Sequence, residues 1–298
     1  MEKLLTTTQL AEAIGASESS MRRWTNSGAL RTARTVGGHR RIALSEAIRF
    51  VRESGATVVR PELLGLPEIS ATAAGKDLSG RALERTLYDA LCSGDSAAAR
   101  GCVAGLFLNG VSVASIFDEA VQVAMHRIGE LWPQDPRAIL VEHRAMNTCL
   151  LALGMLRQML PEPIENAPVA VGGAPEGDPY LLPSLMAGTV LADAGYRDVN
   201  FGPDTPMDVL AVAAEENQAQ VVWLSIKAVA DRATLRTNVD NLAERLRSMQ
   251  ITLVVGGSGA ELLAIRSSKN IHVMRTMGEL AAFARGAAGG TLSPGKPE

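Results

Sequence analysis

The chain has 298 residues, of which 47% are hydrophobic, 20% charged and 4% aromatic, and its formal net charge at pH 7 is −3. That length is enough for about two globular domains, and the composition excludes a wholly disordered or collagen-like chain. Uninterrupted apolar stretches fall short of the roughly 18 residues that span a bilayer, the first residues lack a signal-peptide core, and three cysteines make no disulfide framework, so we expect a cytoplasmic protein with no membrane partner.

The small net charge hides two oppositely charged parts. Residues 1–60 hold ten Lys and Arg side chains and five acidic ones, whereas the other 238 residues hold 19 basic and 27 acidic side chains. A basic segment joined to an acidic body indicates that one module faces an anion and that the other has a different task. Nucleic acid is therefore a candidate partner of the first 60 residues.

The basic segment begins with two predicted short helices. Residues 6–15 carry apolar side chains at helical spacing and end at a glycine, and Ser17 can cap a second helix that runs to Gly28. Two short helices joined by a tight turn predict a helix-turn-helix whose second helix reads DNA. The candidate DNA-contacting side chains of that helix are Ser19, Ser20, Arg22 and Arg23.

A small hairpin is predicted next, over residues 31–42, with Gly37-Gly38 at its turn. His39, Arg40 and Arg41 follow the turn and would reach phosphates or a minor groove, and Ser45 would cap a further helix over residues 46–52. This N-terminal segment resembles the winged helix of the MerR-type transcription regulators, of which the Gly-Gly-His-Arg-Arg wing is typical. The resemblance implies operator DNA as the partner and a homo-oligomer, a dimer or a tetramer, that binds a palindrome.

The rest of the chain divides by its periodicity. After a first domain at 1–62 and a linker at 63–77, residues 78–162 are helical with short breaks, which predicts a four-helix bundle. Residues 167–288 alternate apolar strand-like runs with helices, which predicts a flavodoxin-like (Rossmann-type) α/β domain with a parallel sheet. The predicted strands are 169–171, 199–201, 221–226, 251–255 and 271–274, and residues 289–298 are predicted to be a disordered tail.

In the predicted bundle, Trp132 is followed after nine residues by the pair Glu142-His143. With this pattern the bundle and sheet domain resemble the cobalamin-binding module of the CarH-type photoreceptor regulators. The resemblance implies that a tetrapyrrole binds between bundle and sheet domain, with these three side chains capping its upper face. It also implies ligand contacts on the sheet domain, from Asp178, Tyr180, Ser225, Gly256 and Gly257.

The sheet domain departs from that family at one loop. Where the family has Asp/Glu-x-His-x-x-Gly, with a histidine that ligates cobalt from below, this chain has Asp178-Pro-Tyr180-Leu-Leu-Pro183. We therefore predict no metal ligand from the protein and keep three alternatives. Cobalamin binds without histidine ligation, another tetrapyrrole such as biliverdin or haem takes its place, or the domain binds no ligand and only oligomerises.

The combination predicts a DNA-binding transcription regulator whose oligomerisation or operator affinity is controlled by a tetrapyrrole, with light as a candidate signal. We predict no enzymatic activity, because no paired carboxylates, zinc-ligand cluster or Ser-His-Asp arrangement stands out. Two alternatives stay open. The chain is a ligand-independent MerR-type repressor with a degenerate sensor domain, or it is a corrinoid carrier of the methyltransferase type, against which the basic N-terminal segment argues.

Overall fold

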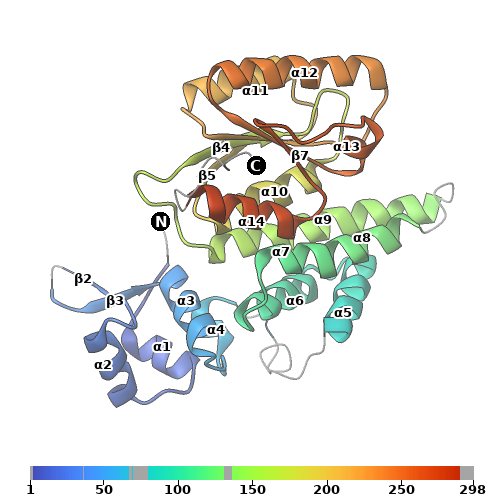
Figure 1. Ribbon diagram of the computed structural model, residues 1–298. Coiled ribbons are helices and arrows are strands. Elements are labelled where there is room, and N and C mark those ends of the chain that lie inside the picture. Colours follow the sequence, from blue (N-terminus) through green and yellow to red (C-terminus); the bar gives the residue numbers. More distant parts are fainter. Residues whose placement is uncertain (1–2, 36, 67–68, 70–79, 131–135, 289–298) are drawn as a thin grey trace, which may run out of the picture. The chain divides into compact units, whose positions relative to one another are not determined.

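The computed structural model describes residues 3–35, 37–66, 69, 80–130 and 136–288 (Figure 1). The chain forms two compact units, Met1–Glu162 and Pro163–Glu298, which are described separately. Trp132, most of the predicted linker and the predicted tail lie outside the described residues.

The first unit opens with the predicted helix-turn-helix, which the structure confirms. Helix α1 (Thr7–Ala13) begins at a capping box in which Thr6 and Gln9 satisfy each other's backbone N–H groups. Helix α2 (Glu18–Ser27) begins at Ser17, whose hydroxyl accepts from the Ser20 N–H, and it ends at Gly28 in the left-handed conformation. The local capping residues therefore fix the length of both helices.

A three-stranded antiparallel sheet in the order β1-β3-β2 follows, formed by β1 (Leu4–Leu5), β2 (Ala33–Arg34) and β3 (Arg40–Ala43). Strands β2 and β3 are the predicted hairpin. Helix α3 (Leu44–Ser54) starts directly after β3 with no side-chain cap, so the prediction that Ser45 caps this helix was wrong, since Ser45 lies inside its first turn. A short helix α4 (Pro61–Leu64) packs on α1.

The second half of this unit is a helical region. Its helices are α5 (Gly80–Ser93), α6 (Ser96–Leu108), α7 (Val113–Ser115), the π-helical turn η1 (Ile116–Val121), α8 (Gln122–Gly129) and α9 (Pro136–Met159). Helix α6 is apolar on all sides and is buried from Gly101 to Leu108, because it packs on both α5 and α9. The regular four-helix bundle stays a prediction.

Helix α9 is the one helix in the described part of the chain that is long and apolar enough to cross a bilayer by length and composition. It also packs on α5, α6 and α8, and Ala145, Cys149, Leu153 and Leu156 are buried there. The core helix of a globular domain meets the same criterion, so α9 carries no argument for a membrane partner.

The second unit is a five-stranded parallel sheet, as predicted. Its strands are β4 (Val169–Gly173), β5 (Arg197–Asn200), β6 (Val221–Ser225), β7 (Thr252–Gly256) and β8 (Ile271–Met274). Helices α11 (Met207–Glu216) and α12 (Arg232–Ser248) cover one face, and α10 (Leu181–Asp193) and α14 (Met277–Ala288) cover the other (Figure 1). A short helix, α13 (Ser258–Leu262), follows β7.

The strand order β5-β4-β6-β7-β8 places the switch point of this sheet between β4 and β6. The chain leaves β4 toward β5 on one side, and it later adds β6 on the other. In doubly wound sheets, ligands bind at the carboxyl ends of the strands where the order reverses. The fold therefore directs attention to the loops that follow β4, β5 and β6.

The indole of Trp223 lies in the core of the second unit, on the α10 side of this switch point. Trp223 is 1% exposed and pairs in register with Gly172 of β4. A Cβ placed on Gly172 would lie 2.1 Å from Cδ2 of Trp223 and 2.3 Å from its carbonyl oxygen. Position 172 therefore tolerates only a glycine.

We expect Gly172→Ala to lower the free energy of unfolding by about 3 kcal/mol or more, because its methyl group would overlap both the indole and fixed backbone. Urea denaturation of the full chain, followed by circular dichroism, measures this effect. Gly256→Ala is the matched control in strand β7, where the nearest atom to a new Cβ is Met274 O at 3.4 Å. The control should change stability by less than about 1 kcal/mol, and equal effects would contradict the packing account.

Candidate functional site

The predicted DNA-contacting residues of α2 lie on its exposed side. Arg22 and Arg23 are exposed, whereas Met21 is buried against the core. Ser19 and Ser20 hydrogen-bond the cap Ser17 through their hydroxyls, at Oγ–Oγ distances of 2.8 and 3.1 Å. The two arginines thus face solvent near the N-terminal half of the helix, where helix-turn-helix proteins contact base edges.

The hairpin is tied to α2 through Arg40. Its Nη1 donates to Thr25 Oγ1 at 2.8 Å and its Nη2 to Asn26 Oδ1 at 3.0 Å. Arg40 also lines, with Arg22 and Thr25 among others, a hollow of about 260 Å³. The structure therefore brings a predicted wing residue and a predicted helix residue together around one hollow. His39 is exposed, and Arg41 donates to the Arg40 carbonyl oxygen at 3.2 Å.

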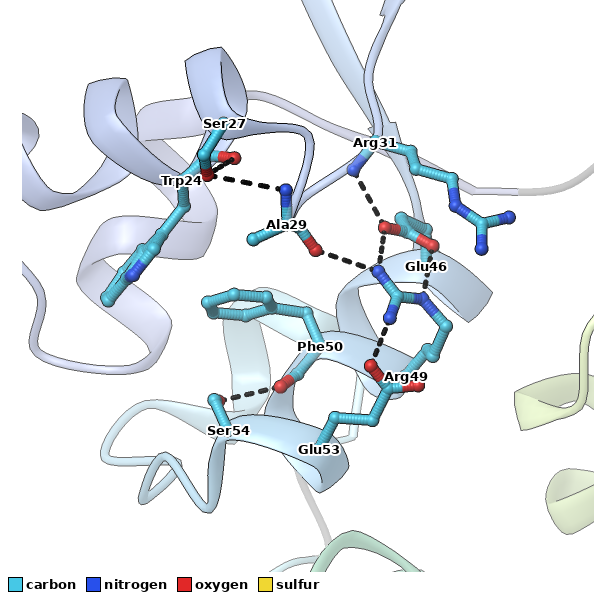
Figure 2. Close-up of polar contacts among 9 residues, drawn as sticks. All are labelled: Trp24, Ser27, Ala29, Arg31, Glu46, Arg49, Phe50, Glu53 and Ser54. Atoms are coloured by element: carbon cyan, nitrogen blue, oxygen red, sulfur yellow. Dashed lines mark hydrogen bonds and ion pairs between the residues drawn. The ribbon is translucent and has the colours of Figure 1, made fainter.

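A partly buried ion-pair cluster, which sequence reasoning missed, fixes α3 against the segment after α2. Figure 2 shows the guanidinium of Arg49 between Glu46 and Glu53 and directed at the Ala29 carbonyl, to which Nη2 donates at 2.9 Å. Glu46 also accepts from the Arg31 N–H at 2.8 Å. Nearby, the rings of Trp24 and Phe50 pack at a centroid distance of 4.9 Å. Helix α2 and the segment after it are thus held to α3 by polar and aromatic contacts.

The Glu46 carboxylate accepts hydrogen bonds from both the Arg49 guanidinium and the Arg31 N–H. Burial by itself would raise the pKa of Glu46, but the hydrogen bonds from Arg49 and from the Arg31 N–H, with the charges of both arginines, outweigh it and lower the pKa below its ordinary value of 4.5. A carboxylate with a lowered pKa stabilises the fold at pH values above its unfolded pKa. That stabilisation is lost as the pH falls through the folded pKa.

We expect Glu46→Gln to lower the free energy of unfolding by about 1–3 kcal/mol at pH 7, because charge-assisted hydrogen bonds are lost. The difference from the wild type should shrink as the pH falls below 4.5, where the wild-type carboxylate becomes protonated. Urea titrations of the full chain at pH 7 and at a pH below 4.5 measure this difference in the free energy of unfolding. Glu53→Gln, which contacts the same Arg49 but is 63% exposed, should have the smaller effect. A pH-independent difference would contradict the assignment.

In the second unit, Asp178 joins the loops at the carboxyl edge of the sheet. Its side chain is fully buried and accepts backbone N–H groups of Lys227 at 2.6 Å, Ala228 at 2.9 Å and Tyr180 at 3.1 Å. The Asp178 carbonyl oxygen also accepts from the Asp204 N–H at 2.9 Å. One residue therefore ties the loops after β4, β5 and β6, and its carboxylate has a structural task in the fold.

The other predicted sheet residues lie along the same edge. Ser225 and Gly256 end β6 and β7 and are paired in register, and Gly257 has φ +92° with the Ile226 carbonyl 2.2 Å from where its Cβ would be. Tyr180 directly precedes α10 and is 38% exposed. Phe201, which follows β5 and which the sequence reasoning did not single out, is 42% exposed. We call this edge, with Asp178, Tyr180, Phe201, Ser225 and Gly256, the sheet rim.

The predicted cap is described only in part. Glu142 is half-buried and His143 exposed on α9, and Ile139 and Leu140 one turn earlier are 43% and 59% exposed. Trp132, the third predicted cap residue, is outside the described residues. In α9 the structure therefore shows a partly apolar surface beside the Glu-His pair, without showing what covers it.

Within the described residues no group of three or more His, Cys, Asp and Glu side chains is arranged to hold a metal ion. Cys102 and Cys149 are buried, and burial raises the pKa of their thiols to about 11 and about 12, which makes them inert. His272, the one histidine of the second unit, lies within β8 and packs on Phe283 at 4.9 Å. The sheet rim offers the phenol of Tyr180 and no histidine.

Comparison with known proteins agrees with the helix-turn-helix at the N-terminus and with a cobalamin-binding-like module after it. A family model described as a helix-turn-helix domain matches residues 4–54, and one described as a B12 binding domain matches residues 83–157. Dimethylamine corrinoid proteins 2 and 1 of Methanosarcina acetivorans are 23% and 22% identical over 149 and 151 residues, which cover 49% of this chain and 69% and 70% of theirs. The monomethylamine corrinoid protein of Methanosarcina barkeri has the same fold (TM-score 0.51, 18% identity, 70% of this chain and 100% of that one).

The chain thus joins a helix-turn-helix domain to a cobalamin-binding-like module. The sheet rim fits a flat macrocycle in one respect. A Cβ on Gly177 would meet nothing within 4 Å, and the aromatic side chains of Tyr180 and Phe201 are both exposed at this rim. It does not fit a histidine-ligated cobalt, because position 180 holds a phenol.

Proposed function

We propose that this chain is a MerR-type, DNA-binding transcription regulator that acts as a homo-oligomer and whose operator affinity changes when a tetrapyrrole, a corrinoid first of all, is bound. The observation that carries the proposal is that the helix-turn-helix match and the B12 binding domain match lie within one compact unit. A bound tetrapyrrole would supply a light-absorbing ring with exchangeable axial ligands. Light is therefore a natural signal for such a switch.

The contact of Arg52 supports a route between the two halves of that unit. Arg52 extends from α3, donates to the carbonyl oxygens of Phe107 and Val111 (3.1 Å for Val111), and its guanidinium lies 3.8 Å from the centre of the Phe107 ring. Phe107 is in the last turn of α6, at the end of the helix where a cation is favoured, and its carbonyl oxygen also accepts from the Gly110 N–H at 3.1 Å. Helix α3 of the DNA-binding half therefore caps a helix of the B12-binding-like half.

From Arg52 the contacts continue to the DNA-reading helix. Arg49, one turn earlier on α3, donates to the Ala29 carbonyl directly after α2. In our proposal a ligand that moves α6 therefore moves α3, and α3 carries α2 with it. The ligand need not touch DNA to change operator affinity, because its preference for one arrangement of α6 is sufficient.

The first test asks whether any tetrapyrrole binds. The 298-residue chain is incubated in the dark with cobalamin, haemin or biliverdin, passed through a desalting column and examined by absorption spectroscopy. The proposal predicts that at least one of them co-elutes. If none does, the sensing part of the proposal is wrong and the chain is better described as a ligand-independent repressor.

For DNA, an operator selected from a random-sequence library serves as the probe. We expect Arg40→Ala/Arg41→Ala to weaken binding and to flatten the dependence of log K on log salt by about one to two units, because phosphate contacts are lost. Arg232→Ala/Arg247→Ala, at two exposed arginines of the second unit, is the charge-matched control and should leave the slope unchanged. Arg22→Ala should in addition change sequence preference. Equal slopes for the wing variant and the control would contradict the assignment.

For the coupling, we expect Arg52→Ala to bring the ratio of operator affinities with and without ligand close to one, while the ligand-free protein still binds DNA. Arg60→Ala is the control, since Arg60 pairs with Glu12 and Glu62 within the DNA-binding half. Fluorescence anisotropy with labelled operator, with and without the co-eluting tetrapyrrole, gives both affinities. A ligand effect that survives in Arg52→Ala would show that the signal travels elsewhere.

A second candidate function is a corrinoid carrier, which the names of the two curated relatives favour. The helix-turn-helix domain and Tyr180 argue against it, because a carrier has no use for a DNA reader. A carrier would bind its corrinoid with the same affinity whether or not DNA is present, which separates the two proposals. We propose no catalytic activity for the chain itself.

A further inference from the structure

A slot lies between strand β4 and helix α10, one pleat below the sheet rim. Gly172 on the strand and Gly188 on the helix leave the space of two missing side chains, and the indole of Trp223 fills it. A Cβ on Gly188 would lie 3.2 Å from Cζ2 of Trp223, and one on Gly172 would overlap the indole at Cδ2. The ring is thus enclosed between the two glycines.

Hydrogen bonds hold the indole in this slot. Its Nε1–H donates to Ser184 Oγ at 3.1 Å, and Ser184 donates in turn to Asn200 Oδ1 at 2.9 Å. Asn200 Oδ1 also accepts from the Gly202 N–H at 2.9 Å, directly under the loop that carries Phe201. Displacing the indole would leave the Ser184 hydroxyl without this donor in a site that is fully buried. The indole is therefore a fixed part of the fold.

The size of the slot bears on the chemistry of the ligand. Cobalamin carries, on the lower face of its corrin ring, a nucleotide that ends in benzimidazole, which is a flat bicyclic group like indole. Such a base could enter a glycine-lined slot below the rim only if that slot were empty. In this chain the slot is filled by a side chain of the same shape.

Resting on the proposed function, we infer that the sheet unit takes a tetrapyrrole at the rim alone, with the ring face toward Tyr180 and Phe201, and that a nucleotide tail makes no essential contact inside the fold. The ligand class is then the tetrapyrrole ring, with or without a tail. Both exposed aromatic side chains suit a flat ring, and Gly177 leaves the approach open.

The test compares cobalamin with cobinamide, which has the same ring and no nucleotide, by absorbance titration of the full chain in the dark. We expect dissociation constants within about threefold of each other for the wild type and for Trp223→Phe, which keeps one aromatic ring in the slot. A preference for cobalamin of roughly tenfold or more in both proteins would overturn the inference. If neither compound binds, the corrinoid part of the proposed function fails as well, which is a different result.

Trp223→Ala tests the slot in the opposite way, because this substitution empties it. Where circular dichroism shows the variant to be folded, its preference for cobalamin over cobinamide should rise by at least about threefold relative to the wild type. A folded variant with an unchanged preference would count against the slot as the place that excludes the nucleotide. If the variant does not fold, the comparison in wild type and Trp223→Phe still decides the question.

Discussion

The cap that Arg52 places on the end of α6 is the contact on which the regulatory account depends. It donates to the carbonyl oxygens of Phe107 and Val111 and covers the Phe107 ring, so α3 and α6 cannot separate without losing these charge-assisted and cation–π contacts. The cluster of Glu46, Arg49 and Ala29 O continues the contact to α2, the helix that we propose reads DNA. One end of this chain of contacts lies in the segment that matches a B12 binding domain and the other in the segment that matches a helix-turn-helix domain. An arginine whose partners lie 55 and 59 residues away has no local sequence signal, and the contact became visible only in the folded chain.

Much of the fold could be predicted because it is specified locally. Thr6, Ser17 and Gly28 define the ends of α1 and α2 by rules that operate within a few residues, and the period of the apolar residues indicated where helices give way to parallel strands. The prediction was wrong at Ser45, because the chain enters α3 directly from β3 and the sheet, with no free turn to cap. The strand order β5-β4-β6-β7-β8 is a long-range property, which the alternation of strands and helices along the chain did not specify.

The candidate site was predicted less completely, for a physical reason. Motif matching identified the rim positions Asp178, Tyr180, Ser225 and Gly256, and the structure gathers them at one edge of the sheet. Motif matching did not show that the Asp178 carboxylate accepts hydrogen bonds from three backbone N–H groups. It also did not show that Arg40 donates hydrogen bonds to Thr25 and Asn26. It also gave no sign that Trp223 fills the space between Gly172 and Gly188, because three residues from two strands and a helix meet there only in three dimensions. These partners decide whether a side chain is free to bind a ligand or already part of the scaffold.

The most direct measurement of the central claim is thermodynamic linkage between the two halves of the chain. Cobinamide affinity of the full-length protein is determined by absorbance titration in the dark, once alone and once with saturating selected operator. If DNA binding and tetrapyrrole binding share one switch, the dissociation constant should change by about fivefold or more, and operator affinity should change by the same factor when cobinamide saturates the protein. Cobinamide binding with an identical dissociation constant in the presence and absence of operator would contradict the account.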